Sequence, residues 1–283
     1  MKRARVLTTR DDALVRRLLA ADPLANLFVA SRVDAGVLWR TVPATVYGWP
    51  ADKPRHLLHA GWNLAPVFGD CADDERDAAI TAFGDIAGQY RSCQSIVGKS
   101  DIALALHRAF AARTPSYAGQ REIRPRQPLM VAREVTATTT DAPVRRITMA
   151  EFTSYHAAAV AMYTEEVGVD PNAGGGRAGY KLHCQNLVET GRAWGIADDA
   201  GNVVFKADVG ISCGGIAQVQ GVWLDPRLRG RGLAVPAMAA ATQCILADHH
   251  AVSLYVNDFN VRAVRTYLRT GFTIAGQFAT VLY

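Results

Sequence analysis

The chain has 283 residues, of which 49% are hydrophobic and 20% are charged. This length allows one large domain or two ordinary ones, and the apolar fraction suffices for a packed core, which excludes disorder of the whole chain. Residues 1–143 hold 19 basic against 15 acidic residues (+4), and residues 144–283 hold 12 against 11 (+1). Because neither half has a dense Lys/Arg stripe, we do not expect a nucleic-acid-binding protein.

The apolar stretches are short. Leu24 to Ser31 and Leu233 to Ala241 are among the longest, and both fall below the roughly 18 residues that a membrane span needs. Asp11 and Asp12 lie where the apolar core of a signal peptide would be. We therefore expect no export signal, no membrane span and a cytoplasmic protein.

The cysteines are odd in number and form no C-x-x-C pair, which argues against a disulfide framework and a zinc knuckle. We expect them to be reduced, buried, apolar side chains. They are Cys71, Cys93, Cys184, Cys213 and Cys244. The adjacent His249 and His250 have no third ligand nearby, so we expect them to cap a helix end and expect no metal.

The first half predicts an alternation of helices and strands. Its expected strands are 5–8, 44–48, 56–60, 94–97 and 128–133. Its expected helices are 11–20, 24–33, 73–89 and 101–112. The second of these helices should begin with Asp22 and Pro23 in the N-cap and first-turn positions.

Residues 136–143 contain no large apolar side chain and end in Pro143. Such a segment is typical of a linker between domains. We therefore expect one domain over residues 1–143 and a second over residues 144–283.

The second half predicts nearly the same order of elements, so the two halves look like versions of one topology. Its expected strands are 144–148, 193–197, 203–211, 216–224, 252–256 and a terminal pair over 272–283. Its expected helices are 150–166, 177–189, 232–248 and 259–269. The fold class is therefore mixed α/β.

The most informative segment is Arg229-Gly230-Arg231-Gly232-Leu233-Ala234, which joins the strand ending at Leu224 to the next helix. Glycines there let the backbone approach a ligand closely, and the N–H groups of the helix start, the helix dipole and the arginines, with Arg227, favour an anion such as a pyrophosphate. A plain glycine corner with solvated arginines remains the alternative. A P-loop at Gly98-Lys99-Ser100 is excluded because Cys93 replaces its first glycine, and Val235 replaces the third glycine of a dinucleotide fingerprint.

At these residues the sequence resembles the GNAT superfamily of acyl-CoA-dependent N-acyltransferases. Arg229 to Ala234 match its pyrophosphate motif Q/R-x-x-G-x-G/A, and the preceding strand matches the one that holds the pantetheine arm. A second family signature is matched by Asn260, Ala263, Tyr267 and Gly271-Phe272. The resemblance covers residues 144–283 and implies a GNAT fold with a mixed sheet, in two tandem GNAT-like domains.

The first half departs from the motif at the matching turn. Asp73, Asp74 and Glu75 would satisfy the helix start themselves and repel a pyrophosphate. We therefore expect a degenerate GNAT-like half that binds no CoA.

The resemblance implies direct attack of a primary amine on the thioester carbonyl of acetyl-CoA, the co-substrate, in a ternary complex. The acyl-CoA would contact the strand, the turn and the following helices. Its expected binding residues are Val222, Trp223, Leu224, Arg229, Gly230, Arg231, Gly232, Leu233, Ala234, Asn260 and Tyr267. A backbone N–H of Val222 to Leu224 would donate to the thioester oxygen, and Tyr267 would protonate the departing sulfur.

The general base is expected among Glu166 and Glu165, which end the first helix of the second half, with His183 as a further alternative. Two carboxylates at a helix C-terminus oppose its dipole, which hints at a use. The amine acceptor and the oligomeric state are not specified by these residues. A non-catalytic acyl-CoA sensor is the second function that the same motifs permit.

Overall fold

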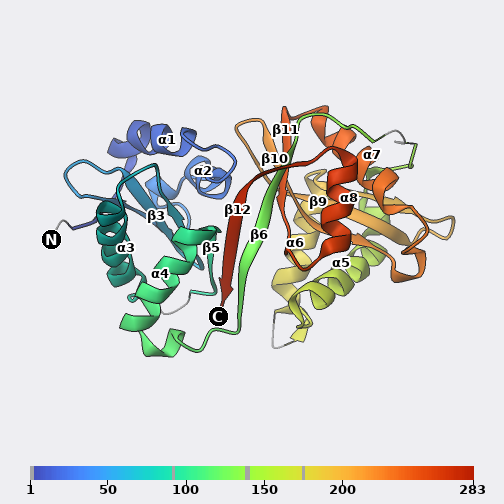
Figure 1. Ribbon diagram of the computed structural model, residues 1–283. Coiled ribbons are helices and arrows are strands. Elements are labelled where there is room, and N and C mark those ends of the chain that lie inside the picture. Colours follow the sequence, from blue (N-terminus) through green and yellow to red (C-terminus); the bar gives the residue numbers. More distant parts are fainter. Residues whose placement is uncertain (1–2, 91–92, 138–140, 174–175) are drawn as a thin grey trace. The chain divides into compact units, whose positions relative to one another are not determined.

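The computed structural model describes residues 3–90, 93–137, 141–173 and 176–283, with mixed α/β structure throughout (Figure 1). The chain folds into two compact units. The N-terminal unit comprises the chain up to Leu129 with Tyr255–Phe259 and Ala275–Tyr283, and the C-terminal unit comprises Met130–Leu254 and Asn260–Ile274. The expected mixed α/β class is confirmed.

This division differs from the linear boundary expected at residue 143. Thr136 donates its N–H to the carbonyl of Thr270 over 3.1 Å, within the C-terminal unit. The expected linker includes residues 138–140, which lie outside the described residues. Instead of a terminal strand pair, the chain ends in one strand, β12 (Thr273–Leu282), which belongs to the N-terminal unit from Ala275 onward and pairs with β5 from Phe278 to Leu282.

The sheet of the N-terminal unit has the order β1-β2-β3-β4-β5-β12. Its further strands are β1 (Arg5–Val6), β2 (Thr45–Trp49), β3 (His56–Ala60), β4 (Asn63–Val67) and β5 (Ser95–Lys99). All neighbours are antiparallel except β4 and β5, which are parallel. The sequence analysis did not predict β4, and Pro66 within this strand is unusual for a central strand. The strand is nevertheless almost wholly buried, and hydrophobic burial outweighs this preference.

Helices cover both faces of this sheet (Figure 1). They are α1 (Asp12–Ala20), α2 (Leu27–Asp34), α3 (Asp73–Ala87) and α4 (Ser100–Arg113). Neighbouring residues of β3 separate the two cores: Leu58 packs with α3 and α4, and Leu57 packs with α1 and α2. Helix α2 begins later than expected, because Asp22 accepts the N–H of Ala25 in a turn instead of capping the helix.

The C-terminal unit repeats this arrangement, with the strand order β11-β10-β9-β8-β7. The strands are β7 (Arg145–Arg146), β8 (Ala193–Ala197), β9 (Val203–Cys213), β10 (Ile216–Leu224) and β11 (Ala251–Tyr255). The helices are α5 (Phe152–Val167), α6 (Arg177–Glu189), α7 (Ala234–Leu246) and α8 (Val261–Thr270). Among the described strand pairs from β7 to β11, β10 and β11 run parallel and the others antiparallel, as β4 and β5 run parallel in the other unit. Strand β6 (Glu122–Ala132) carries the chain from one unit into the other.

All five cysteines are free thiols, as expected. Only Cys93 and Cys184 are buried, whereas Cys71, Cys213 and Cys244 are half-buried, so the expectation of burial was wrong for three of the five. His249 caps the end of α7, since its ring nitrogen lies 3.0 Å from the carbonyl of Ile245. Within the described part of the chain, every helix is too short or too polar to cross a membrane.

Candidate functional site

The site is built around the second half of β10. The parallel ladder with β11 joins Ile216–Gln218 to Ala251–Ser253, and past Gln218 the described residues of β10 pair with β9 alone. The β9 register then jumps from Gln220 to Trp223, so that Gly221 and Val222 form a bulge. Gly221 has φ +57°, a left-handed conformation that favours glycine. The segment Val222 to Leu224, expected to hold pantetheine, therefore lies where the two parallel strands have parted.

The loop after β10 depends on two glycines in the left-handed conformation. Gly230 has φ +76° and Gly232 has φ +78°. A Cβ built on either would meet no described atom within 4 Å. The glycines are thus needed for the backbone path, and the space beside them is open to a ligand.

Helix α7 starts at Ala234, two residues later than predicted, with Leu233 in the N-cap position. Its first turn holds no acidic residue, and no side chain of the described residues caps it. The first N–H groups of the helix and the positive end of its dipole therefore lack a protein anion.

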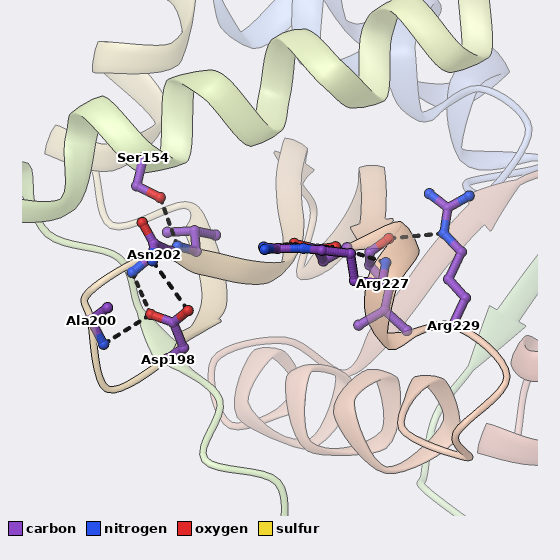
Figure 2. Close-up of polar contacts among 9 residues, drawn as sticks. Ser154, Asp198, Ala200, Asn202, Arg227 and Arg229 are labelled. Atoms are coloured by element: carbon purple, nitrogen blue, oxygen red, sulfur yellow. Dashed lines mark hydrogen bonds and ion pairs between the residues drawn. The ribbon is translucent and has the colours of Figure 1, made fainter.

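The three arginines of the loop differ in their surroundings, and Figure 2 shows two of them, Arg227 and Arg229. Arg227 binds the carboxylate of Asp225 through Nε and Nη2, at 3.0 and 2.6 Å, and so neutralises an acid within the loop. Arg229 donates from Nε to the carbonyl of Leu224 over 2.9 Å. Arg231 is exposed. In this structure Arg227 is paired with Asp225 and Arg229 with Glu165, so a neighbouring carboxylate balances the charge of each.

The two candidate bases end α5 and differ in their partners. Glu165 receives both Nη groups of Arg229, at 2.6 and 2.8 Å. These hydrogen bonds lower the pKa of the Glu165 carboxyl, which makes it a weaker base. Glu166 is exposed, and its charge helps to raise the pKa of Tyr267.

Tyr267 lies on α8, and two residues of the second sequence signature, Asn260 and Gly271, stand at the ends of this helix. The side chain of Asn260 accepts the N–H of Ala263 over 3.2 Å and caps the start, and Gly271, with φ +119°, ends the helix. Tyr267 is 7% exposed, and burial, with the charge of Glu166, raises its pKa well above the usual value. The phenol is therefore protonated at neutral pH and can donate.

His183, the other candidate base, lies exposed on α6. Desolvation lowers the pKa of its imidazole, so the ring is neutral at pH 7. Its neighbours include Asp208 and Lys206, whose charges act on it.

The sequence interpretation missed a buried polar cluster next to the bulge. Lys206 and Asp208 on β9 form an ion pair, and Tyr155 on α5 donates to Asp208 over 3.0 Å. Lys206 also donates to the carbonyl of Gly221 over 2.7 Å. The signal was present in the sequence: two charged residues at i and i+2 share one face of an otherwise apolar strand.

Comparison with known proteins agrees with the sequence motifs. Residues 187–272 match the acetyltransferase (GNAT) family, and residues 44–155 match a domain of unknown function, DUF4081. The chain carries a GNAT acetyltransferase domain. No curated protein matches it by sequence. The family supports acyl transfer as the class of reaction.

Three similar solved structures are each of nearly the same length. A GNAT-family acetyltransferase from Colwellia psychrerythraea is 12% identical with a TM-score of 0.58, covering 99% of both chains. A GCN5-related N-acetyltransferase from Sphaerobacter thermophilus is 15% identical with a TM-score of 0.58, covering 98% of this chain and 94% of that one. A tandem GNAT protein from the clavulanic acid biosynthesis pathway is 15% identical with a TM-score of 0.55, covering 98% and 97%. At these identities the likeness shows the fold, and the expected GNAT fold is confirmed.

Proposed function

We propose that the chain is an acetyl-CoA-dependent N-acetyltransferase that binds one acyl-CoA, in the C-terminal unit, and transfers the acyl group to a primary amine. The main support is the turn between β10 and α7. Two left-handed glycines border open space there, directly before a helix start that lacks a protein anion. This turn lies within the segment that matches the GNAT family.

The pyrophosphate of the acyl-CoA would lie against the N–H groups from Gly230 to Ala234. Backbone donors at a helix start bind a phosphate with good geometry, and the helix dipole adds to the attraction. Arg231 supplies positive charge at the same turn, and Arg229 lies there in an ion pair with Glu165. Arg229 is held in position by Glu165 and by the carbonyl of Leu224.

The pantetheine arm would follow Val222 to Leu224, where β10 no longer pairs with β11. Backbone groups on that edge are available to the arm's amides. In the transition state, negative charge develops on the thioester oxygen, and a backbone N–H of this segment would stabilise it.

The transfer forms a bond between the amine nitrogen and the thioester carbon and breaks the bond from that carbon to sulfur. The amine loses one proton to a base, and the sulfur leaves as a thiolate. Tyr267 donates a hydrogen bond to this sulfur. A thiol has an ordinary pKa of about 8.5, lower than that of a buried phenol, so the hydrogen bond precedes any transfer of the proton.

We assign the base to Glu166 in preference to Glu165. The carboxylate of Glu165 is occupied by Arg229, and its lowered pKa weakens it as a proton acceptor. Glu166 is exposed at the end of α5, and its charge acts on Tyr267, the residue proposed to serve the sulfur. His183 is the third candidate, and its neutral imidazole could accept the proton through a water.

The N-terminal unit is proposed as a GNAT-like domain without an acyl-CoA site. Its corresponding helix, α3, begins with Asp73, Asp74 and Glu75. These carboxylates complement the helix dipole and would repel a pyrophosphate.

Release of free thiol from acetyl-CoA tests the assignment. The full chain is incubated with acetyl-CoA and a panel of amines: small amines, aminoglycosides, peptides with a free N-terminus and lysine-containing peptides. Amine-dependent thiol release and an acetylated product of matching mass are expected. Binding of acetyl-CoA without release for any amine would favour the sensor function, and lack of binding would contradict both.

A further inference from the structure

Lys206 is a buried charged residue that the transfer reaction, as proposed, does not use. Its side chain is 0% exposed, in the middle of β9. Burying an ammonium group is unfavourable, and a buried ion pair is often no more stabilising than apolar residues of the same size. Stability alone therefore does not explain why a lysine occupies this position.

The ammonium group of Lys206 has two acceptors. One is Oδ2 of Asp208, at 2.5 Å, and the other is the carbonyl oxygen of Gly221, at 2.7 Å. Asp208 in turn accepts the hydroxyl of Tyr155 at its other oxygen, Oδ1. Burial and the charge of Asp208 raise the pKa of Tyr155, which keeps this hydroxyl a donor. A chain of charge-assisted hydrogen bonds thus ends on the backbone of the bulge.

The bulge fixes which way the next N–H points. The Gly221–Val222 peptide is trans, so the N–H of Val222 points opposite to the carbonyl of Gly221 and away from Lys206. A hydrogen bond from a cation to the carbonyl of an amide withdraws electron density and makes the N–H of the same amide a stronger donor. The left-handed φ of Gly221 and the ammonium together hold this peptide in one orientation.

We propose that Lys206 is a positioning residue for acyl transfer: it orients and polarises the Gly221–Val222 peptide so that the N–H of Val222 stabilises the charge on the thioester oxygen. The inference rests on the proposed function, because it needs an acyl thioester beside Val222. Lys206 itself does not touch the substrate. Asp208 neutralises its charge and Tyr155 orients Asp208.

Two double variants test the role without leaving a lone buried charge. Lys206→Met with Asp208→Asn removes the donor to Gly221, and Lys206→Gln with Asp208→Asn keeps a neutral donor. Tyr180→Phe is the matched control, because it removes the hydrogen bond of a partly buried phenol to the carbonyl of Ala159, over 2.9 Å, and leaves the Lys206, Asp208 and Tyr155 hydrogen bonds in place. Thermal unfolding of each variant monitors the fold.

The first readout is turnover with saturating amine. We expect kcat to fall about tenfold or more in the Met variant, less than the 10²- to 10³-fold typical of losing an oxyanion donor outright. The Gln variant should lie between the Met variant and the wild type, and the control Tyr180→Phe should stay within about threefold of the wild type. Folded Met and Gln variants with wild-type kcat would overturn the proposal.

The second readout is binding, which does not require turnover. S-ethyl-CoA, a thioether with CH₂ in place of the carbonyl, is compared with acetyl-CoA by calorimetry. The wild type should prefer acetyl-CoA, and the Met variant should lose this preference while its Kd for S-ethyl-CoA stays unchanged. Equal weakening of both ligands would mean that Lys206 is only structural. If the wild type binds acetyl-CoA but transfers to no amine, the proposed function fails while this readout still decides the role of Lys206.

Discussion

The two units share a strand–loop–helix segment but differ in its loop and in the start of its helix. In each, a strand with a parallel neighbour leads through a loop into a helix: β4 into α3, and β10 into α7. The first loop has five residues (68–72) and the second has nine (225–233). Strand β4 pairs evenly with β3 and contains Pro66, which has no N–H to donate, whereas β10 bulges at Gly221 and Val222.

The helix starts differ most. The first turn of α3 holds Asp73, Asp74 and Glu75, and Glu75 is bound by Arg55 at 2.8 Å and His56 at 3.1 Å. Its dipole is complemented by the protein itself. Among the described residues no side chain caps the start of α7, and its loop adopts left-handed glycine conformations next to open space. The comparison teaches that a fold can stabilise a helix start with its own side chains or leave it uncapped, and our proposal that only the C-terminal unit binds an anion rests on this difference.

The largest effect is expected for the phenol of the C-terminal unit. Tyr267→Phe should lower kcat about 10²-fold or more, because a buried donor to the departing sulfur is lost, while the Kd of acetyl-CoA should change little. Tyr283→Phe is the matched control in the N-terminal unit, where that hydroxyl lies 2.9 Å from Nδ1 of His107. Steady-state kinetics of both variants check the contrast; similar rates for the two would return Tyr267 to a packing role.

Variants of the two carboxylates of α5, Glu166 and Glu165, should differ in their pH–rate profiles. A general base must be ionised, so kcat/KM rises with pH as it loses its proton, and Glu166→Gln should remove that rise and lower kcat about 100-fold. Glu165→Gln should keep the rise and change kcat less than about fivefold, since its carboxylate serves Arg229. The pH–rate profiles of the two variants decide; the opposite outcome would move the base to Glu165, and two unchanged profiles would favour His183.

An acidic residue introduced directly before α7 would imitate the acidic start of α3. Leu233 is 43% exposed directly before α7, so Leu233→Asp should cost little packing while placing a carboxylate where the pyrophosphate is proposed to bind. We expect the Kd of acetyl-CoA to rise about 100-fold, since a charge at about 4 Å opposes a phosphate strongly. Leu233→Asn, which has the same shape without the charge, should stay near the wild type in calorimetric titration. Equal losses would point to shape instead of charge.

The smallest effect is expected at the glycines. Gly230→Ala and Gly232→Ala should each destabilise the fold by about 1–2 kcal/mol, because both positions are left-handed. Only Gly232 occupies the glycine position of the motif, so only Gly232→Ala should also raise the Kd of acetyl-CoA, by about tenfold. Thermal unfolding checks the first expectation and calorimetry the second. If the two variants lose affinity equally, the loop conformation matters and the space beside Gly232 does not.

Much of the fold was predictable from local patterns. The bounds of α6, β3, β8 and β10 were predicted as observed, because each has a clear period and turn residues at both ends. Strand β4 was not predicted, and β12 was expected as a pair of strands. Its pairing with β5, far away in sequence, is a tertiary contact that no local pattern indicates.

The parts of the site that depend on backbone conformation were predictable from the sequence. The parts that depend on contacts between side chains far apart in the sequence were mostly not. Glycine spacing indicated the turn at Gly230 and Gly232 because only glycine adopts those φ values readily. The pairing of Arg229 with Glu165 joins residues 64 positions apart and has no sequence signal. Lys206 and Asp208 did have a sequence signal, because they are charged residues in an otherwise apolar strand.

The central claim, that only the C-terminal unit is built for acyl-CoA, is tested most directly by the stoichiometry of binding. Calorimetric titration of the full chain with acetyl-CoA should give one site per chain. The same titration of Leu233→Asp should lose most of that binding, while Asp73→Ala with Asp74→Ala in the N-terminal unit should leave one site of unchanged affinity. Two sites in the wild type, or one site that is abolished by the N-terminal substitutions and untouched by Leu233→Asp, would contradict the account.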